Sequence, residues 1–432
     1  MSVAAGKASE TLHFGDGIML SIDPGDTAFV LVCTALVCMM TPALALFYGG
    51  LVKERDMMSI MIQNFVCMGV IGIIWVFGGF SLAFGPDIGG VIGDIRPYFG
   101  MYHIGIEPNP EYSDKVPFIM IFAYQMMFAI ITPALMTGAF VGRIRFGAYL
   151  LFISFWTILV YLPAAHWIWG GGFLSKLGVV DFAGGIVIHT AAGFSALATA
   201  KYLGKRRAAV GEAASSPVSM PLVALGAGLL WFGWFGFNAG GAYAADALAA
   251  YAFTNTMLAG STAMLVWMFW EWREEGRPTF EGVLVGAVAG LATITPAAGY
   301  VEPMFGLLIG AIGATVCFHA KYVQKFLRID DTLEVWRAHG VGGMTGALLI
   351  GVFASSSINE VSASLQQLGV QALAVVIVAT YAWFVTVLIL KVIDSISILR
   401  VSQEVQEAGL DTLYGGQAYN LWDMKNRSDS AK

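Results

Sequence analysis

Long stretches without a charged residue alternate with short polar segments along almost the whole chain. Eleven stretches of 18 or more residues lack Asp, Glu, Lys and Arg, and they cover residues 27–52, 57–86, 116–142, 146–175, 182–200, 213–245, 247–270, 282–301, 303–320, 338–359 and 361–390. A transmembrane helix needs about 20 apolar residues. Because apolar and polar residues do not alternate, a transmembrane β-barrel is not expected. The pattern therefore predicts an all-α polytopic membrane protein with eleven transmembrane helices, the eleventh of them long.

The composition agrees with this prediction and excludes several classes of protein. Apolar residues make up 57% of the chain and charged residues 12%, against about 45–50% and 25% in soluble domains. A nucleic-acid binder, a secreted disulfide scaffold and an ordinary cytosolic enzyme are therefore excluded. No ATP-binding loop of the form GxxxxGK[ST] occurs, and no cofactor is expected. All four cysteines lie in apolar stretches, which predicts buried core residues rather than disulfides or metal ligands: Cys33, Cys38, Cys67 and Cys317.

The distribution of basic residues predicts an orientation in the membrane. An odd number of spans places the termini on opposite sides. With the C-terminus inside, 19 of the 23 Lys and Arg residues lie on the inner side, and only Lys7, Arg96, Lys115 and Lys176 lie outside. Basic loops favour the cytoplasm. We therefore expect a multi-pass protein of the inner (plasma) membrane with an extracellular segment (1–26), an eleven-helix domain (27–399) and a cytoplasmic tail (400–432). No cleavable signal peptide is visible in residues 1–25.

Short motifs recur at the same place in each half of the chain. The third and eighth stretches both contain Ile-Thr-Pro-Ala, at residues 131–134 and 294–297. At the fifth and tenth stretches an aspartate stands eight residues before a histidine, as Asp181–His189 and Asp331–His339, with Gly193 and Gly343 four residues further on. Five spans per half is an odd number. The chain is therefore predicted to contain an inverted repeat of five plus five helices, an arrangement found in transporters.

The inverted repeat places two histidines at the centre of the membrane. His189 and His339 each lie eight residues beyond their aspartate, or about 12 Å along a helix. Since the two spans run in opposite directions, both side chains approach the midplane of a core about 30 Å thick. Each could instead be a structural residue that a neighbouring carbonyl satisfies, or a metal ligand, although no third ligand is predicted at that depth. Because ionisable residues inside a membrane usually serve a function, we favour a functional role over a structural one.

Several runs of sequence resemble signatures of the ammonium transporter family (Amt/Mep/Rh), and its Amt branch in particular. They are AHWIWGGG (165–172), DFAGGIVIHTAAG (181–193), GWFGFNAGG (233–241), ITPAAGY (294–300) and HGVGG (339–343). The resemblance runs in order from about residue 20 to about residue 420. It implies an eleven-helix fold, a homotrimer and transport of ammonium or ammonia for nitrogen uptake.

The same resemblance implies roles for individual residues of a pore. His189 and His339 match the family's twin histidines, which form the pore and proton relay, and Phe128 and Phe237 match the stacked gate above them. Either phenylalanine taken alone would be read as a packing or lipid-facing residue. The implied mechanism recruits NH₄⁺, removes a proton and conducts NH₃ through an apolar channel.

Five further residues are candidates for substrate binding. Trp169 and Tyr124 match aromatic positions beside the family's outer cation site, and Asp181 matches an aspartate below it. Thr295 and Gly241 complete the set, and Gly241 stands where the family usually has a serine. Taken alone, Trp169 would be read as an interfacial anchor and Asp181 as a helix N-cap.

The C-terminal tail bears on whether a PII-type signal protein binds, and the function itself has two alternatives. Gly409-Leu410-Asp411 resembles the family's tail, but Tyr414-Gly415-Gly416 replaces the usual His-Gly-Glu. Regulation by a PII-type signal protein is therefore a weaker expectation than the trimer. An ammonium sensor that uses the same binding site is the alternative to a transporter. An integral-membrane enzyme lacks any nucleophile–base or metal constellation, so no enzymatic activity is expected.

Overall fold

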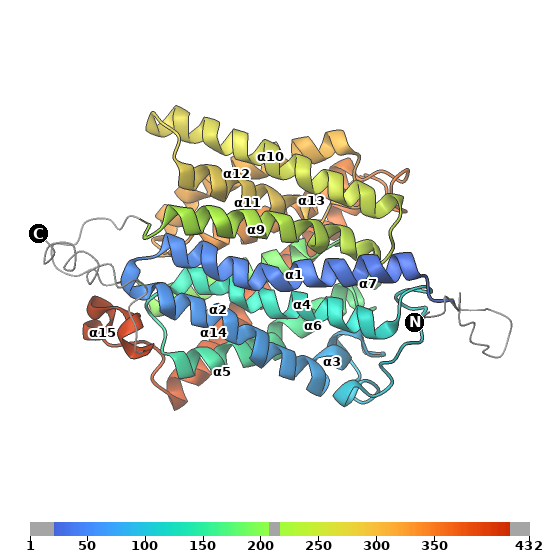
Figure 1. The fold of residues 1–432 in the computed structure, drawn as a ribbon, viewed down its shortest axis with the longest axis horizontal. Helices are drawn as coiled ribbons and strands as arrows, with labels where there is room; N and C mark the ends of the chain where they lie inside the picture. Colours follow the sequence, from blue (N-terminus) through green and yellow to red (C-terminus); the bar gives the residue numbers. More distant parts are fainter. Residues whose placement is uncertain (1–20, 207–216, 415–432) are drawn as a thin grey trace, which may run out of the picture.

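A bundle of helices that share one general direction forms the body of the protein (Figure 1). The computed structural model describes residues 21–206 and 217–414. The expected extracellular segment up to residue 20 and the tail beyond residue 414 lie outside these residues. Within them, the start of α1 (Pro24–Leu51) and the tail helix α15 (Gln403–Ala408) lie at opposite ends of the bundle.

Each of the eleven predicted stretches coincides with a helical segment. In the first half these segments are α1, α2 to α3 (Met57–Ile74, η2 Trp75–Gly79, Phe80–Phe84), α4 with η4 (Phe118–Met136, Thr137–Phe140), α5 to α6 (Phe146–Trp156, η5 Thr157–Tyr161, Leu162–Ile168) and η6 with α8 (Gly185–Thr190, Ala191–Leu203). In the second half they are α9 (Met220–Ala239), α10 (Ala247–Glu275), α11 (Phe280–Ile294), α12 (Pro303–Leu327) and η8 with α13 (Trp336–Val341, Gly342–Phe353), and α14 (Leu365–Ile396) follows them.

The connections carry the remaining short elements. A two-stranded antiparallel sheet, β1 (Asp87–Ile88) and β2 (Ile92–Gly93), lies in the loop after α3, where η3 (Phe99–Met101) follows it. The helix α7 (Phe173–Lys176) follows α6. The single turn η1 (Glu54–Asp56) precedes α2, and η7 (Gly240–Ala242) follows α9. The turn η9 (Leu410–Tyr414) ends the described tail.

Eight described helical segments are long and apolar enough to cross a membrane. The expected spans outside this group are α10, α11 and η8 with α13, and α11 is a shorter apolar helix of 15 residues. The prediction of an all-α, multi-pass membrane protein is confirmed, while the count of eleven membrane crossings stays a prediction. The cysteines are free, and Cys33, Cys67 and Cys317 are buried as expected.

The second half of the chain runs opposite to the first. The backbone N–H of Ser219, at the start of α9, donates to the carbonyl of Gly50 at the end of α1. The first helix of the second half therefore begins where the first helix of the first half ends, and the two pack antiparallel. The helix α14 returns to pack on α5 and α8 of the first half.

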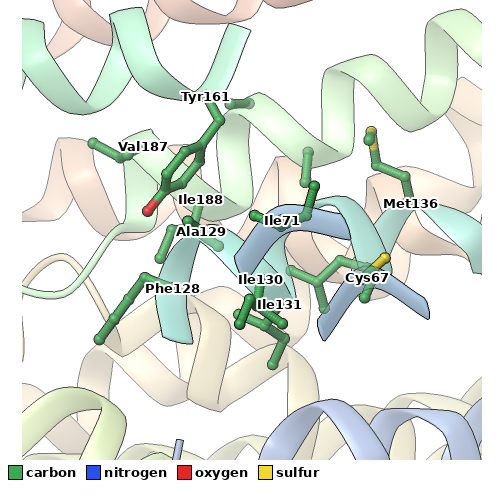
Figure 2. Packing of buried hydrophobic residues seen from close by; sticks show 14 of the residues in the cluster. Cys67, Ile71, Phe128, Ala129, Ile130, Ile131, Met136, Tyr161, Val187 and Ile188 are labelled. Carbon is green, nitrogen blue, oxygen red and sulfur yellow. The ribbon is translucent and has the colours of Figure 1, made fainter. Parts of the chain in front are cut away.

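The two repeat-related helices that carry the histidines cross at glycines. A Cβ atom on Gly193 would lie 2.2 Å from Cα of Gly340, and one on Gly343 would lie 2.3 Å from the carbonyl oxygen of Gly185. No side chain fits these distances, so glycine is required for the two backbones to meet. This close crossing brings the first turns of α8 and α13 together in the middle of the bundle. Figure 2 shows part of the buried apolar core, with side chains of α2, α4 and η6, among them Ile71, Phe128 and Ile188.

The described part of the tail is fixed to the start of α2. The Asp411 carboxylate accepts hydrogen bonds from the backbone N–H groups of Met58 (2.9 Å) and Ser59 (2.7 Å). In return, the Leu410 N–H donates to Asp56 Oδ1 at 3.1 Å. A carboxylate at the first turn of a helix satisfies unpaired donors and favours the helix dipole. The tail up to Tyr414 is therefore an integral part of the helical bundle.

Candidate functional site

The two repeat-related histidines meet inside the bundle. Nδ1 of His339 lies 3.1 Å from Nδ1 of His189, and the rings are nearly parallel with centroids 5.1 Å apart. Both side chains are buried. A hydrogen bond between two ring nitrogens needs one donor and one acceptor, so one Nδ1 carries a proton and the other does not. In a neutral pair the accepting ring then carries its proton on Nε2.

Buried aspartates hold the short helical turns that carry these histidines. The Asp181 carboxylate accepts four backbone N–H groups, those of residues 184–187, at 2.7–3.0 Å. The Asp331 carboxylate accepts the N–H groups of Val335 (3.1 Å) and Trp336 (2.8 Å). Both turns, η6 and η8, are π-helical. Aspartate thus acts as an N-cap in each half, eight residues before its histidine, which explains the repeated spacing in the sequence.

A narrow apolar cavity adjoins the histidine pair. Its volume is about 10 Å³, close to the space that one water-sized molecule needs. The walls are aliphatic and aromatic apart from the two imidazoles, and Trp234 and Phe237 are among them. The His189 ring stacks on Trp234, with centroids 5.5 Å apart. Within the described residues, Nε2 of His189 has no hydrogen-bond partner. The cavity therefore offers one small molecule an apolar surface beside the two imidazole rings.

Thr295, a candidate for substrate binding, lies behind Trp234 of this cavity wall and lines neither this cavity nor the larger pocket described below. Its hydroxyl accepts a hydrogen bond from Nε1 of Trp234 (2.9 Å) and donates to the carbonyl of Leu291 (2.8 Å). Because the hydroxyl is bonded on both sides, its role in this structure is to orient the tryptophan on which His189 stacks. The sequence missed Trp234 itself, although it stands in the GWFGFNAGG run.

Phe128 and Phe237 separate the inner cavity from a larger pocket. Their ring centroids are 4.4 Å apart, and both rings are buried. Phe128 lines the outer pocket and Phe237 lines the inner cavity. The ring pair therefore forms the partition between the two spaces, at the place expected for a gate.

The outer pocket is open, has a volume of about 400 Å³ and is lined by aromatic rings with some polar groups. Trp169, Tyr124, Asp181 and Gly241 all contribute to its wall, as expected. Trp169 is fixed by a hydrogen bond from Nε1 to the carbonyl of Asp181 (2.8 Å). Since the Asp181 carboxylate is fully used in capping, its effect on a bound cation is electrostatic.

The Tyr124 hydroxyl is not free to replace the serine that Gly241 lacks. It donates toward the backbone carbonyls of Gly236 (3.0 Å) and Phe237 (2.8 Å). Residues that the sequence analysis missed supply other polar groups in the pocket. Tyr243 accepts a hydrogen bond from Gln125 at 2.6 Å, and Glu111 brings a carboxylate. These residues lie outside the signature runs, so no sequence signal pointed to them.

A cluster formed by one buried histidine and two exposed charged residues fixes the backbone that leads to Trp169. The fully buried His166 places Nε2 at 2.9 Å from Asp87 Oδ1 and Nδ1 at 3.0 Å from the carbonyl of Ala83. Nζ of Lys176 lies 2.5 Å from the other oxygen of Asp87. The cluster therefore ties β1 and α7 to the end of α6, three residues before Trp169.

Acid is expected to weaken this cluster. Hydrogen bonds from His166 and Lys176 lower the pKa of Asp87 from its ordinary value of 3.8 to about 2. A depressed pKa stabilises the fold above the ordinary value, and this contribution is lost as the pH falls from 3.8 toward 2. The wild type should therefore lose more thermal stability over that interval than Asp87→Asn. Thermal midpoints in detergent measure the difference, with Asp114→Asn, at an exposed carboxylate outside the cluster, as control. Equal acid losses in wild type and Asp87→Asn would contradict the expectation.

The fold and the site define a class of protein, a multi-pass helical membrane protein whose two inverted halves enclose an apolar cavity beside paired imidazoles. The model of the Ammonium Transporter Family matches residues 28–419. An ammonium transporter of Bacillus subtilis is 42% identical over 91% of this chain and 98% of its own length. The crystal structure of Candida albicans Mep2 superposes with a TM-score of 0.82 at 34% identity, covering 89% of this chain and 87% of that one. A structure described as a sensor Amt protein superposes with a TM-score of 0.84 at 27% identity, covering 91% and 98%. The chain belongs to the ammonium transporter family.

Proposed function

We propose that this protein recruits NH₄⁺ in the outer pocket, that the ion gives up a proton to the imidazole pair His189–His339, and that NH₃ passes the phenylalanine pair into the cavity beside these histidines. The observation that best supports this proposal is the order of the three features. An open aromatic pocket is followed by the Phe128–Phe237 ring pair, and the ring pair by a cavity of about 10 Å³ beside two imidazoles. The pocket has room for a cation with its hydration water, and the cavity admits one small molecule.

The outer pocket favours a small cation. Aromatic faces attract ammonium with about 0.5–2 kcal/mol each, depending on desolvation. Trp169, Phe128 and Tyr124 present rings to the pocket, and Glu111 adds negative charge. Potassium would be attracted in a similar way, so the pocket alone does not select ammonium.

Selection arises at the partition, because only ammonium can leave its charge behind. A bare ion in an apolar medium costs on the order of tens of kcal/mol by Born solvation, whereas neutral NH₃ carries no such cost. Beyond the partition, the bonded pair His189–His339 offers NH₃ both a donor and an acceptor nitrogen. The linked imidazoles also give the released proton a polar route, since histidine can accept on one nitrogen and donate from the other. Potassium has no proton to lose and stays outside.

The orientation and the partners belong to the same proposal. The charge asymmetry supports an extracellular N-terminus, a cytoplasmic C-terminus and eleven crossings of the plasma membrane by residues 27–399. A reporter fused after Lys432 should therefore be cytoplasmic, and a signal from the outside would contradict the span count.

Homotrimeric assembly and a PII-type signal protein at the cytoplasmic face are carried over from the family resemblance. Size measurement in detergent and pull-down with a PII protein test them separately.

The alternative function is an ammonium sensor that uses the same outer pocket. The superposition on a structure described as a sensor Amt protein favours keeping it. Uptake separates the two functions. Purified protein in vesicles should accelerate ammonium entry over protein-free vesicles if it is a transporter. Ammonium binding without accelerated uptake would favour the sensor.

Restoring a hydroxyl at Gly241 is expected to tighten ammonium binding. Gly241 lines the outer pocket, and the Tyr124 hydroxyl is already bonded to backbone. A Cβ at this position would lie 3.0 Å from the carbonyl oxygen of Phe182, so a small shift is needed. Gly241→Ser should gain about 0.5–1.5 kcal/mol, the net value of one hydrogen bond. The apparent affinity for ammonium measures this gain, and Gly241→Ala controls for the added Cβ. Equal affinities for the two variants would show that the hydroxyl does not reach the ligand.

A further inference from the structure

A second concave region lies on the outer surface of the bundle, away from the pore. It is a groove of about 390 Å³ whose lining is almost wholly apolar. Phe194 and Leu197 of α8 form one wall, Trp383 and Phe384 of α14 form the other, and Leu327 at the end of α12 closes it. Phe384 is 66% exposed. In a membrane protein such an exposed apolar groove faces lipid chains and not water.

Basic residues stand at one end of this groove. Lys201, in the last turn of α8, is part of its lining, and Arg328 lies between the lining residues Leu327 and Ile329. Both side chains are exposed, and neither forms an ion pair with another described residue. The groove thus pairs an apolar trough with positive charge where α8 and α12 end. A long basic side chain at the end of a membrane helix places its charge at the headgroup level.

We infer that this groove binds an anionic phospholipid, with an acyl chain between α8 and α14 and the phosphate near Lys201 and Arg328. Basic pockets between transmembrane helices on the cytoplasmic side recognise anionic headgroups. Under the orientation proposed above, the bound lipid belongs to the inner leaflet. The binding itself depends neither on that orientation nor on transport, so failure of either proposal leaves the other testable.

The groove is connected to the helices that carry the histidines. Phe194 packs edge-on against Trp336, with ring centroids 6.4 Å apart, and Trp336 stands three residues before His339. Phe194 itself follows His189 by five residues on the η6–α8 segment. A lipid chain in the groove therefore covers Phe194, whose ring packs directly on the other repeat-related segment. Its binding stabilises their packing by mass action, because the unfolded chain has no such groove.

Trp383 provides a built-in reporter for the test. The full-length protein is placed in phosphatidylcholine vesicles with a small fraction of phosphatidylglycerol or phosphatidylcholine that carries brominated chains, which quench tryptophan on contact. The groove-specific signal is the quenching in the wild type minus that in Trp383→Phe. Brominated phosphatidylglycerol should quench this signal at a lower fraction than brominated phosphatidylcholine does.

Charge variants decide whether the basic end is responsible. Each basic residue near the surface contributes about a five-fold preference for an anionic lipid, from about 1 kcal/mol per charge. Lys201→Gln should lower the preference about five-fold, and the double variant with Arg328→Gln on the order of 25-fold. Lys201→Arg should retain the preference. Arg273→Gln, at the end of α10 and outside the groove, should also leave it unchanged. Equal quenching by both headgroups, or a preference that survives the double variant, would overturn the inference.

Discussion

Replacing His189 with alanine is expected to abolish or strongly reduce ammonium-driven current while the protein still folds. The imidazole is bonded to His339 at 3.1 Å and stacks on Trp234, and His189 lines the inner cavity. Its removal opens the cavity and breaks the only imidazole-to-imidazole contact among the described residues. NH₃ would then lose its polar partner, and the proton would lose its route.

The two histidines are expected to act as one unit. Changes to residues that act together are not additive, so His189→Ala, His339→Ala and the double variant should lose similar amounts of ammonium current. An enlarged cavity lined by small residues should also admit water and weaken the exclusion of potassium. Currents from purified protein on a solid-supported membrane measure both effects, with thermal midpoints to show that each variant folds. Full ammonium current together with full exclusion of potassium in both single variants would make the histidines structural.

Asp181→Asn is expected to cause a large loss of stability together with a loss of transport. The carboxylate accepts four backbone N–H groups, two on each oxygen. In asparagine an NH₂ group replaces one carboxylate oxygen, and this group cannot accept the two backbone N–H groups that bond to that oxygen. About two charge-assisted hydrogen bonds are therefore lost. Such bonds contribute about 1.5–3 kcal/mol each, which makes the expected loss on the order of 3 kcal/mol or more.

The loss should reach the pore because η6 is the segment that positions His189. Thermal unfolding followed by tryptophan fluorescence, and ammonium current under the same conditions, measure the two effects together. Asp394→Asn is the matched control, because that exposed carboxylate bonds only to the Tyr202 hydroxyl among the described side chains. An Asp181→Asn protein as stable and as active as the wild type would show that the cap is dispensable.

The sequence was sufficient where a motif carries its own geometry. The paired Asp–His spacings placed two histidines together, because a capped turn followed by eight residues has a defined length in each half. The alternation of apolar and polar segments likewise located the long helical segments, but not short elements such as η1, η3 and α15. It could not distinguish segments that face lipid from segments enclosed by protein. The segment of η8 and α13, for example, carries the buried Arg337 and is not among the strongly apolar helices.

The remaining parts of the site depend on rotations and turns that the periodicity does not encode. Thr295 and its repeat counterpart Thr132 both bond to the carbonyl four residues back, yet only Thr295 also meets a pore tryptophan. Tyr243 reaches the outer pocket through a left-handed backbone conformation with φ of 51°. The π-helical turns that contain the two histidines shift their side chains relative to a regular helix. None of these features leaves a pattern in the hydrophobic periodicity of one sequence.

Under the proposed function, ammonium crosses this protein because it can lose a proton, whereas potassium cannot. Purified protein on a solid-supported membrane, given alternating pulses of ammonium and potassium at equal concentration, tests this claim most directly. We expect ammonium pulses to give a current that grows with the density of the protein on the membrane. We expect potassium pulses to give no current above that of protein-free membranes. Potassium currents of the same size as the ammonium currents would contradict it, because the intact ion would then be passing the phenylalanine pair.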